Sequence, residues 1–574
     1  MAAAGSTEWV IKPRDVSEER HLAQALGIHP VLAGLLISRG FDNPGAAQAF
    51  LNPSLDDLHD PYELPDLEPA VDRILQALDA GEPILVHGDY DADGVTASAL
   101  LVRFLNKLGG QVQYFVPNRF KDSYGMSTRA VRASAGQVGL IIAVDCGVRD
   151  HEAVTAAREQ DQDVIVVDHH EPGESLPAEA LVIDPKREDS RYPERELAAV
   201  GLAFKLASAI CERRELPQNS LQRAFLDLVA IGTIADVTPL VGENRTLTHA
   251  GLQVLPHTRK VGLQVLMEVC GLSGAVTARD VGFRIGPRLN AVGRMADAHD
   301  ALELLLADDE VEARRMALYL DSLNSQRQRE QETTFRQAMD IVETQVELDS
   351  ERVLVLARAG WHRGVLGIVA AKVLEATRRP TVTLTIEGDE ARGSARSIPG
   401  FDIARAFAEC DDLLERHGGH ALAGGLTLTR GHVDALRERL NELGWAWMSE
   451  DDLRPRLTAD CEVEFAEVDE DLAVSLMRLE PCGEANPEPL LVGRGAMVLE
   501  VRGVGSGGRH LKLLVSAAGR EFECIAFGFG QEVSWVRPRS ELDLCFVPMM
   551  DDYGGLARLQ LRVEDLKRAA PGRQ

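Results

Sequence analysis

Short apolar runs alternate with helix-favouring stretches in the first half of the chain. ILV (84–86), LIIAV (140–144) and VIVV (164–167) are the clearest of these runs. Runs without polar alternation are typical of strands that are buried on both faces of a parallel sheet. We therefore predict an α/β domain with a parallel sheet over residues 81–297.

Helical spacing of apolar positions marks the segments on either side of this domain. Residues 1–80 carry short helical patterns broken by Pro and Gly, and we expect this segment to pack on the α/β core. Residues 298–347 are charged, with apolar positions at helical spacing, which predicts long helices that connect two domains.

Two further domains are predicted in the second half. RVLVLA (352–357) and TVTLTI (381–386) flank a helical run, which predicts a smaller α/β domain over residues 348–450. From 451 to 574, apolar and polar positions alternate between Gly-rich turns, as in HLKLLV and LQLRVED. This alternation predicts the half-buried strands of a small antiparallel β-barrel. A length of 574 residues also exceeds what one core normally serves.

Composition excludes several classes of protein. The eight cysteines form no C-x-x-C pair, which argues against a disulfide framework and against a structural zinc site. There is no signal-peptide pattern, and no apolar run approaches the roughly 18 residues that a membrane span requires. We expect a cytoplasmic protein with no membrane association.

The net charge of −29 by itself favours a partner other than DNA, because phosphate binding normally uses Lys and Arg. Net charge does not describe a groove, however, and arginines collect near the motifs described below. An acidic surface with a basic channel is compatible with this composition. The arginines are Arg284, Arg288, Arg294, Arg363, Arg392 and Arg396.

Each predicted strand of the first domain ends in residues that can bind a metal. HGDYDADG follows the first run, DCG the second and DHH the third, while Asp236 follows a helical run. Ligands bind beyond the carboxyl ends of the strands in an open parallel sheet, so these clusters should converge on one crevice. Taken singly, each has an ordinary explanation as a turn, a helix cap or a solvated pair. Their shared position at strand ends makes that explanation improbable.

Oxygen ligands with a minority of imidazole suit Mn²⁺ or Mg²⁺, and the histidines favour Mn²⁺. Two such ions about 3.5–4 Å apart can activate water and stabilise the leaving oxygen in phosphoryl displacement. The pattern therefore predicts two divalent ions and phosphodiester hydrolysis.

The run VHGDYDADGVTA, followed by DCG, VVDHH and IADVTPL, resembles the metal-binding motifs of the DHH phosphoesterase superfamily. GFRIGPRLNAVGRM, GWHRGVLGIVAAK, GSARS, GGHALAGG and EPCGEANPEP also resemble signatures of the RecJ exonuclease family. The resemblance covers nearly the whole chain. It implies a DHH catalytic domain, a DHHA1 substrate-binding domain and a C-terminal OB fold.

The resemblance also implies roles for individual residues. One ion would be held by His87, Asp91 and Asp145. The second would be held by Asp93, Asp145, His169 and Asp236, so that Asp145 bridges the two.

Three more residues complete the predicted catalytic set. Asp89 and Asp168 would orient metal ligands. His170 would face the scissile phosphate and stabilise charge or donate a proton.

The same motifs suggest a set of substrate-binding residues. Gly-rich GGHALAGG would approach phosphate closely, although a tight turn also explains its glycines. Arg288 and Asn290 would hold the nucleotide backbone, with an ion pair or a cap as the alternative. The full set is Arg288, Asn290, Trp361, His362, Arg363, Ser394, Arg396, Gly418, Gly419 and His420, with Tyr90, Tyr114, Phe120 and Tyr124 as candidates for base stacking.

The function that the resemblance implies is a single-strand-specific 5′→3′ DNA exonuclease of repair and recombination, which releases 5′-mononucleotides. Its expected partners are single-stranded DNA with a 5′ end, a single-strand-binding protein and a helicase, and we expect a monomer. One alternative is a phosphodiesterase of short oligonucleotides or cyclic dinucleotides, which would not need the barrel. Another is a non-catalytic DNA-binding scaffold, which would have lost the metal ligands.

Overall fold

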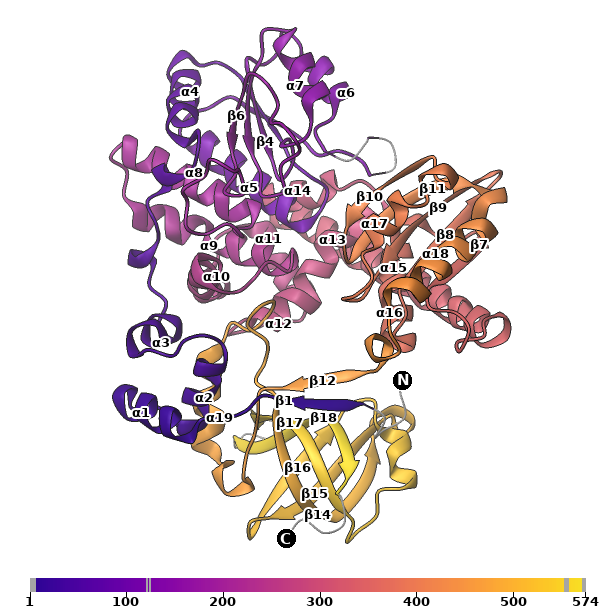
Figure 1. The fold of residues 1–574 in the computed structure, drawn as a ribbon. Coiled ribbons are helices and arrows are strands. Elements are labelled where there is room, and N and C mark those ends of the chain that lie inside the picture. The colour runs from indigo at the N-terminus through magenta and orange to yellow at the C-terminus, as the bar shows by residue number, and fades with distance from the viewer. Residues whose placement is uncertain (1–6, 120–121, 123–124, 552–556, 570–574) are drawn as a thin grey trace. The chain divides into compact units, whose positions relative to one another are not determined.

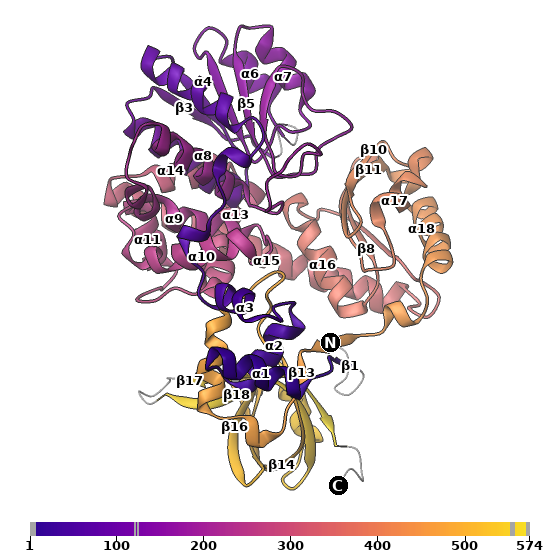
Figure 2. The same ribbon diagram turned by 60° about the vertical axis from the view of Figure 1, so that its left-hand side comes forward.

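A computed structural model describes residues 7–119, 122, 125–551 and 557–569 of the protein. The chain forms two compact units (Figures 1 and 2). Residues 52–329 and 480–487 form the sheet unit, and residues 1–51, 330–479 and 488–574 form the barrel unit. Each is described by itself.

The sheet unit contains a five-stranded, fully parallel sheet in the order β3-β2-β4-β5-β6, which confirms the predicted α/β class. The three apolar runs are its β2, β4 and β5. The strands are β2 (Ile84–His87), β3 (Val112–Phe115), β4 (Leu140–Val144), β5 (Asp163–Val167) and β6 (Ala180–Ile183).

Helices cover both faces of this sheet, which is why its strands lack polar alternation. Ile142 belongs to a core shared with α4, α5, α8 and α9. Its neighbour Ile141 faces a second core under α6 and α7. These helices are α4 (Leu67–Ala80), α5 (Ala92–Lys107), α6 (Thr128–Ala133), α7 (His151–Arg158), α8 (Ala199–Arg213) and α9 (Gln218–Ala235).

The rest of the sheet unit is helical. A π-helical turn, Val281–Ile285, lies between α12 and α13. The predicted long helices are present, and α15 begins in the sheet unit and ends in the barrel unit. The helices are α10 (Gly242–Val254), α11 (Val261–Val269), α12 (Ala278–Asp280), α13 (Gly286–Met295), α14 (His299–Leu306) and α15 (Glu310–Gln345).

The barrel unit contains the predicted smaller α/β fold. Its sheet has the order β10-β11-β9-β8-β7, in which only β7 and β8 are parallel. Its elements are β7 (Leu354–Ala359), α16 (Leu366–Thr377), β8 (Thr381–Glu387), β9 (Glu390–Arg396), α17 (Ile403–Ala408), β10 (Arg416–His420), β11 (Ala423–Thr429) and α18 (Val433–Trp447).

The predicted barrel closes through pairing of its first strand, β14, with β17. We predicted an antiparallel barrel, but β16 and β18 pair in parallel, so the barrel is mixed. Its elements are β13 (Cys461–Glu462), α19 (Glu470–Leu476), β14 (Leu491–Val504), β15 (His510–Ala517), β16 (Arg520–Ala526), β17 (Glu541–Asp551) and β18 (Arg558–Arg568).

The N-terminal segment divides between the units, whereas we expected all of it on the α/β core. β1 (Glu8–Ile11) pairs in parallel with β12 (Arg456–Ala459) in the barrel unit. Helices α1 (Val16–Leu26), α2 (Pro30–Ser38) and α3 (Pro44–Leu51) belong to the same unit. The apolar face of α2 is completed there by α19 rather than by the parallel sheet.

Within the described residues, no single helix is long and apolar enough to cross a membrane. One bent pair, α1 with α2, passes that test by length and composition only.

Candidate active site

The loop after β2 brings three carboxylates to the carboxyl edge of the sheet. Asp91 is the N-cap of α5, and its Oδ1 accepts hydrogen bonds from the backbone N–H groups of Asp93 (2.9 Å) and Gly94 (3.1 Å). Asp is favoured at this position because it satisfies free N–H groups of the first turn. The cap fixes the Asp91 carboxylate at the junction of strand and helix.

Gly94 allows this loop to fold tightly over α5. A Cβ at position 94 would lie 2.7 Å from the backbone N of Asp89 and 2.8 Å from its Cβ. Only glycine permits that approach without movement of the Asp89 backbone.

We predict that Gly94→Ala displaces Asp89 and lowers hydrolytic activity about 100-fold, because small displacements of reacting groups are costly. It should also cost about 1–3 kcal/mol of stability through overpacking. Gly201→Ala in α8 is the matched control, since a Cβ there would make only ordinary contacts of 3.6 Å or more. Equal activity of the two variants in a nuclease assay would contradict the prediction.

Three helices hold Asp93, which is 1% exposed. Its oxygens accept hydrogen bonds from the backbone N–H groups of Ala199 (2.7 Å) and Val200 (2.9 Å) at the start of α8. A Cβ on Gly232 of α9 would lie 2.8 Å from Asp93 Oδ1. The positive end of α8 thus stabilises a carboxylate that is otherwise buried.

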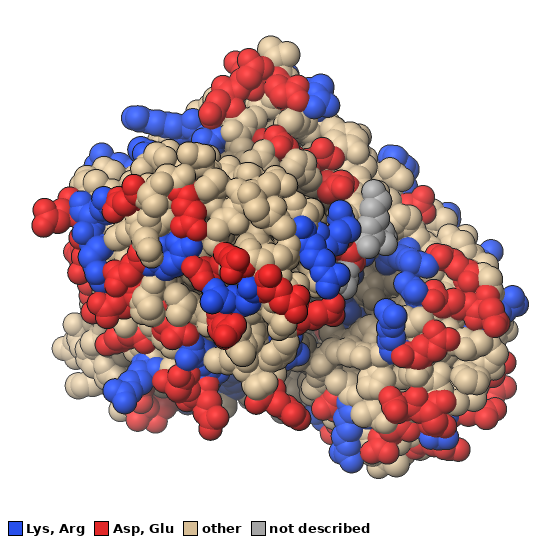
Figure 3. Space-filling model, turned by 90° about the horizontal axis from the view of Figure 1, so that it is seen from above, with Lys and Arg blue, Asp and Glu red and all other residues tan. Residues whose placement is uncertain are grey.

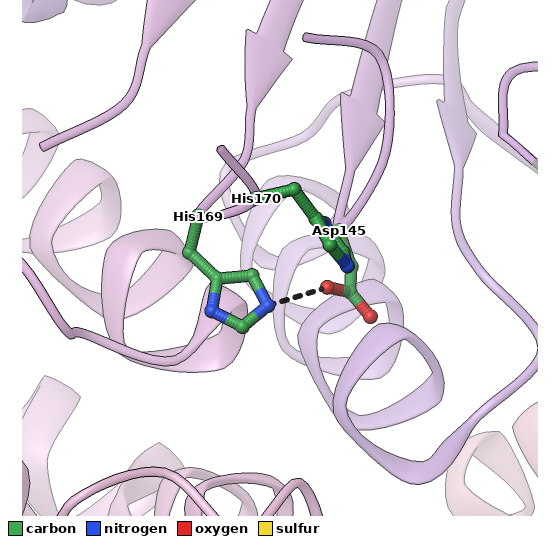
Figure 4. A group of neighbouring side chains, drawn as sticks. All are labelled: Asp145, His169 and His170. Carbon is green, nitrogen blue, oxygen red and sulfur yellow. Dashed lines mark ion pairs between the residues drawn. The ribbon is translucent and has the colours of Figure 1, made fainter. Parts of the chain in front are cut away.

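Asp145 and His169 meet at the ends of β4 and β5. Asp145 adopts a left-handed conformation with φ 63°, a position that Asp tolerates better than most residues. His169 Nε2 lies 3.2 Å from Asp145 Oδ1 and 3.8 Å from Asp236 Oδ2. Figure 4 shows the His169 ring pointing at the Asp145 carboxylate.

The convergence predicted from strand ends is therefore present. Ligand atoms of Asp93, His169 and Asp236 lie within 4.8 Å of one another, as do those of Asp89, Asp91 and Asp145. A third group of this size joins Asp145 to His169 and His170. The first group holds three of the four residues predicted for the second ion.

His87, predicted as a ligand of the first ion, does not join these groups. It is fully buried, and its Nε2 accepts a hydrogen bond from the Ser127 backbone N–H at 2.9 Å. Its Nδ1 faces Cys146 Sγ at 3.7 Å. Asp89, which was predicted to orient metal ligands, is the third member of the group with Asp91 and Asp145, where His87 was predicted.

Burial and mutual repulsion oppose ionisation of these carboxylates. Burial, followed by the charge of Asp91, raises the pKa of Asp93 to about 7. Burial, then Asp93 and Asp91, raise the pKa of Asp236 to about 9. The same causes, burial first, raise the pKa values of Asp145 and Asp89 well above the ordinary range.

This donor set fits divalent cations. Asp89 Oδ1 and His169 Nε2 are buried and have no hydrogen-bond partner among the described residues, so each can direct a lone pair into the cluster. Oxygen-rich ligation with one imidazole suits Mn²⁺ or Mg²⁺, whose charge would relieve the repulsion among the carboxylates.

His170 and Asp168 form a charged pair beside the cluster. His170 Nδ1 lies 2.7 Å from Asp168 Oδ1, which also accepts from the backbone N–H of His169 at 2.8 Å. Burial works against it, but the hydrogen bond and charge of Asp168 raise the pKa of His170 to about 9. The pair with Asp168 thus favours the imidazolium form of His170, which can donate a proton or stabilise an anion.

Two arginines lie beside the cluster. The sequence placed Arg294 only near the motifs, and it gave no indication of Arg119. Burial first, then the charges of Arg119 and Arg327, lower the pKa of Arg294 to about 10. The guanidinium of Arg119 lies 5.3 Å from the centre of the Tyr90 ring, in the metal-binding loop. Arginines that lie beside the carboxylate cluster can bind an anion such as a phosphate. Arg119 belongs to no recognisable motif, so only the fold reveals it.

The two predicted nucleotide contacts in this unit have internal partners. Arg288 is paired with Asp321 at 2.7 Å and donates to the Arg284 carbonyl at 2.7 Å. Asn290 Oδ1 accepts from the Ala92 backbone N–H at 2.9 Å, so it supports the start of α5. These are the ion pair and the cap that were considered as alternatives.

The residues of the barrel unit that were predicted to bind the substrate lie in two places. Trp361 is buried with its Nε1 donating to Gln337 at 2.9 Å, and His362 Nδ1 accepts from the Gly364 N–H at 3.1 Å. Arg363 pairs with Glu387.

The second place is the sheet edge. Gly418, Gly419 and His420 form the exposed edge strand β10, paired with β11. Ser394 and Arg396 lie on β9, which pairs with the other side of β11.

The candidates for base stacking are separated. Tyr90 lies in the metal-binding loop, but the Tyr114 hydroxyl donates to Glu303 at 2.6 Å. Phe120 and Tyr124 lie outside the described residues.

Known protein families match all three predicted domains. The DHH family, N-terminal domain, matches residues 83–233, the DHHA1 domain matches residues 350–445, and the RecJ OB domain matches residues 459–565. The single-stranded-DNA-specific exonuclease RecJ of Escherichia coli (strain K12) is 34% identical over 97% of this chain and 98% of its own length. The chain belongs to the RecJ family.

Other RecJ proteins extend this finding. RecJ of Bacillus subtilis (strain 168) is 37% identical over 98% of this chain and 71% of its own length. The crystal structure of RecJ from Thermus thermophilus in complex with Mn²⁺ matches with a TM-score of 0.85 and 32% identity, over 98% of this chain and 80% of that one. The same protein in complex with Mg²⁺ matches with a TM-score of 0.79.

Proposed function

We propose that this protein is a single-strand-specific 5′→3′ DNA exonuclease that releases 5′-mononucleotides and acts in repair and recombination. The observation that carries the proposal is the convergence of Asp89, Asp91, Asp93, Asp145, His169 and Asp236 into adjoining ligand groups beside Arg294. The substrate and the metals follow the RecJ relatives, whose names and structures specify single-stranded DNA and bound Mn²⁺ or Mg²⁺.

Asp89, Asp91 and Asp145 would hold one ion, and Asp93, His169 and Asp236 the other, with Asp145 reaching both. Two divalent ions supply an activated water and neutralise the charge that develops on a phosphodiester.

The chain's own groups would complete the reaction. Arg294 and Arg119 would receive the phosphate and orient it. His170, kept protonated by Asp168, would donate its proton to the departing oxygen of the DNA.

The polarity is tested with a long single strand labelled at its 5′ or 3′ end and incubated with Mn²⁺. We expect immediate release of a labelled mononucleotide from the 5′-labelled strand and gradual shortening of the 3′-labelled strand. Duplex DNA with blunt ends should be a poor substrate. Preference for a dinucleotide over the long strand would instead support the oligonucleotide phosphodiesterase, and binding without hydrolysis would support a scaffold.

Arg294→Ala should lower kcat/KM on single-stranded DNA about 100-fold, because a charge-assisted contact to phosphate is lost close to the reacting centre. Arg315→Ala is the control, since Arg315 is an exposed arginine whose ion pair among the described residues is with Glu312, in the preceding turn of α15. Unchanged kcat/KM for Arg294→Ala would remove this residue from the proposed mechanism.

A further inference from the structure

A second cavity lies within the sheet unit, away from the carboxylate cluster. It has a volume of about 1000 Å³ and is lined by the end of α5, strand β3, the start of α9 and the end of α10. Its volume is at the upper end of the range for small-molecule sites.

The rim of this cavity carries cations that the protein does not neutralise. Lys107, Arg223 and Arg259 line it and are exposed, and in the described part of the chain none of them forms an ion pair. On the face drawn in Figure 3, Lys and Arg are interspersed with Asp and Glu. In a chain of net charge −29, three uncompensated cations around one cavity favour an anionic ligand.

Two other cations that line the cavity are neutralised by ion pairs with carboxylates. Lys260 Nζ lies 2.8 and 2.9 Å from the carboxylate oxygens of Asp227, and Arg103 pairs with Asp308 at 3.1 Å. These pairs are parts of the wall. The three rim cations remain available to a ligand.

Part of the cavity wall is apolar. Val102, Phe225, Val254 and Leu306 contribute to its lining, and the polar side chains of Asn106 and Gln253 stand beside them. An inorganic anion would not use this surface. A molecule with a flat, partly apolar ring system and one or more phosphates would contact both the apolar wall and the rim cations. The side-chain amides of Asn106 and Gln253 could form hydrogen bonds with the edges of its ring.

The cavity is separate from the metal-binding cluster. Helix α5 begins beside Asp91 and ends at Lys107 after 16 residues, and α9 runs for 18 residues from Gln218 to the residue before Asp236. At 1.5 Å per residue these helices are about 24 and 27 Å long. Both therefore lead from the cavity wall to metal ligands.

We propose that this cavity is a binding site for a nucleoside phosphate, with the phosphates at Lys107, Arg223 and Arg259 and the base against Val102 and Phe225. The site is distinct from the nuclease centre. It does not depend on the proposed nuclease function.

Isothermal titration of ATP and of dAMP into the full-length protein tests the proposal. EDTA is present so that the carboxylate cluster cannot recruit nucleotide through a metal. We expect binding of at least one nucleotide with a Kd on the order of 10 µM, weakened about tenfold or more by Arg223→Glu and by Arg259→Glu. Arg191→Glu, an exposed arginine of the same unit outside the cavity, should bind as the unchanged protein does.

Several outcomes would overturn the proposal. These are absence of binding at about 1 mM nucleotide, unchanged affinity in both cavity variants, and pyrophosphate binding as tightly as ATP. Binding of an acidic peptide but of no nucleotide would also overturn it. Thermal melting confirms that each variant is folded, and Arg223→Gln replaces any variant that is not.

Discussion

Asp145→Asn should reduce hydrolysis of single-stranded DNA with Mn²⁺ by about a thousandfold or more, while the protein remains folded and binds the strand. Asp145 is the residue within reach of both ligand groups, through Asp89 and Asp91 on one side and His169 on the other. Removal of a residue that merely orients a metal ligand typically costs 10–100-fold. Loss of a shared ligand should cost more, because both ions are affected.

Asparagine is the suitable replacement because it tolerates the left-handed conformation at φ 63° that alanine would strain. Asp161→Asn is the matched control, since Asp161 also has a positive φ, of 56°, but lies in the turn before β5, at the opposite edge of the sheet. Initial rates with a labelled strand, together with a strand-binding titration, measure the effect. Near-normal hydrolysis by Asp145→Asn would refute a shared role for this carboxylate.

Without a divalent ion, the protein should lose stability as pH rises from about 4 to about 9. The pKa values of Asp93, about 7, and Asp236, about 9, are raised above the ordinary 3.8 of an Asp, mainly by burial. The folded state therefore holds more protons than the unfolded chain in this window, and deprotonation favours unfolding. Each unit by which a pKa is raised corresponds to about 1.4 kcal/mol, so the loss over the window should be on the order of 10 kcal/mol.

Mn²⁺ should reverse this trend, because it binds the deprotonated cluster of the folded state alone. At a concentration 100 times its Kd, it would add about 2.7 kcal/mol. The free energy of unfolding in urea is measured at several pH values in EDTA and in Mn²⁺. Asp236→Asn should flatten the profile in EDTA, and high salt separates this local effect from general repulsion in an acidic chain. A profile that rises with pH in EDTA would contradict the prediction.

Much of the fold follows from the apolar pattern. ILV, LIIAV and VIVV are strands because both faces of their sheet are covered, and that burial leaves a signal in the sequence. The mixed pairing in the barrel leaves no such signal, because the parallel partner of β16 is β18, which follows it only after β17. Alternation shows which face of a strand is buried but not which strand lies next to it.

In the candidate site too, local sequence predicts some positions, whereas contacts between residues far apart in the chain determine others. Strand ends predict that Asp91, Asp145 and His169 converge, since topology alone requires it. His87 also lies at a strand end, but its Nε2 accepts a hydrogen bond from Ser127, 40 residues further along the chain, which strand order does not predict. Likewise, the capping role of Asn290 is set by Ala92, 198 residues away. Such partners are specified by the completed fold.

The pairing of β1 with β12 has a consequence for how the protein is made. Glu8 aligns with Arg456, so β1 cannot pair with β12 until nearly 450 further residues have been synthesised. At about 5–20 residues per second, this delay is at least about 20 seconds. The parallel sheet needs no residue beyond β6 for its strand pairing and can form during that time. Synthesis therefore imposes an order in which β1 pairs with its partner only after the strands of the parallel sheet have been made.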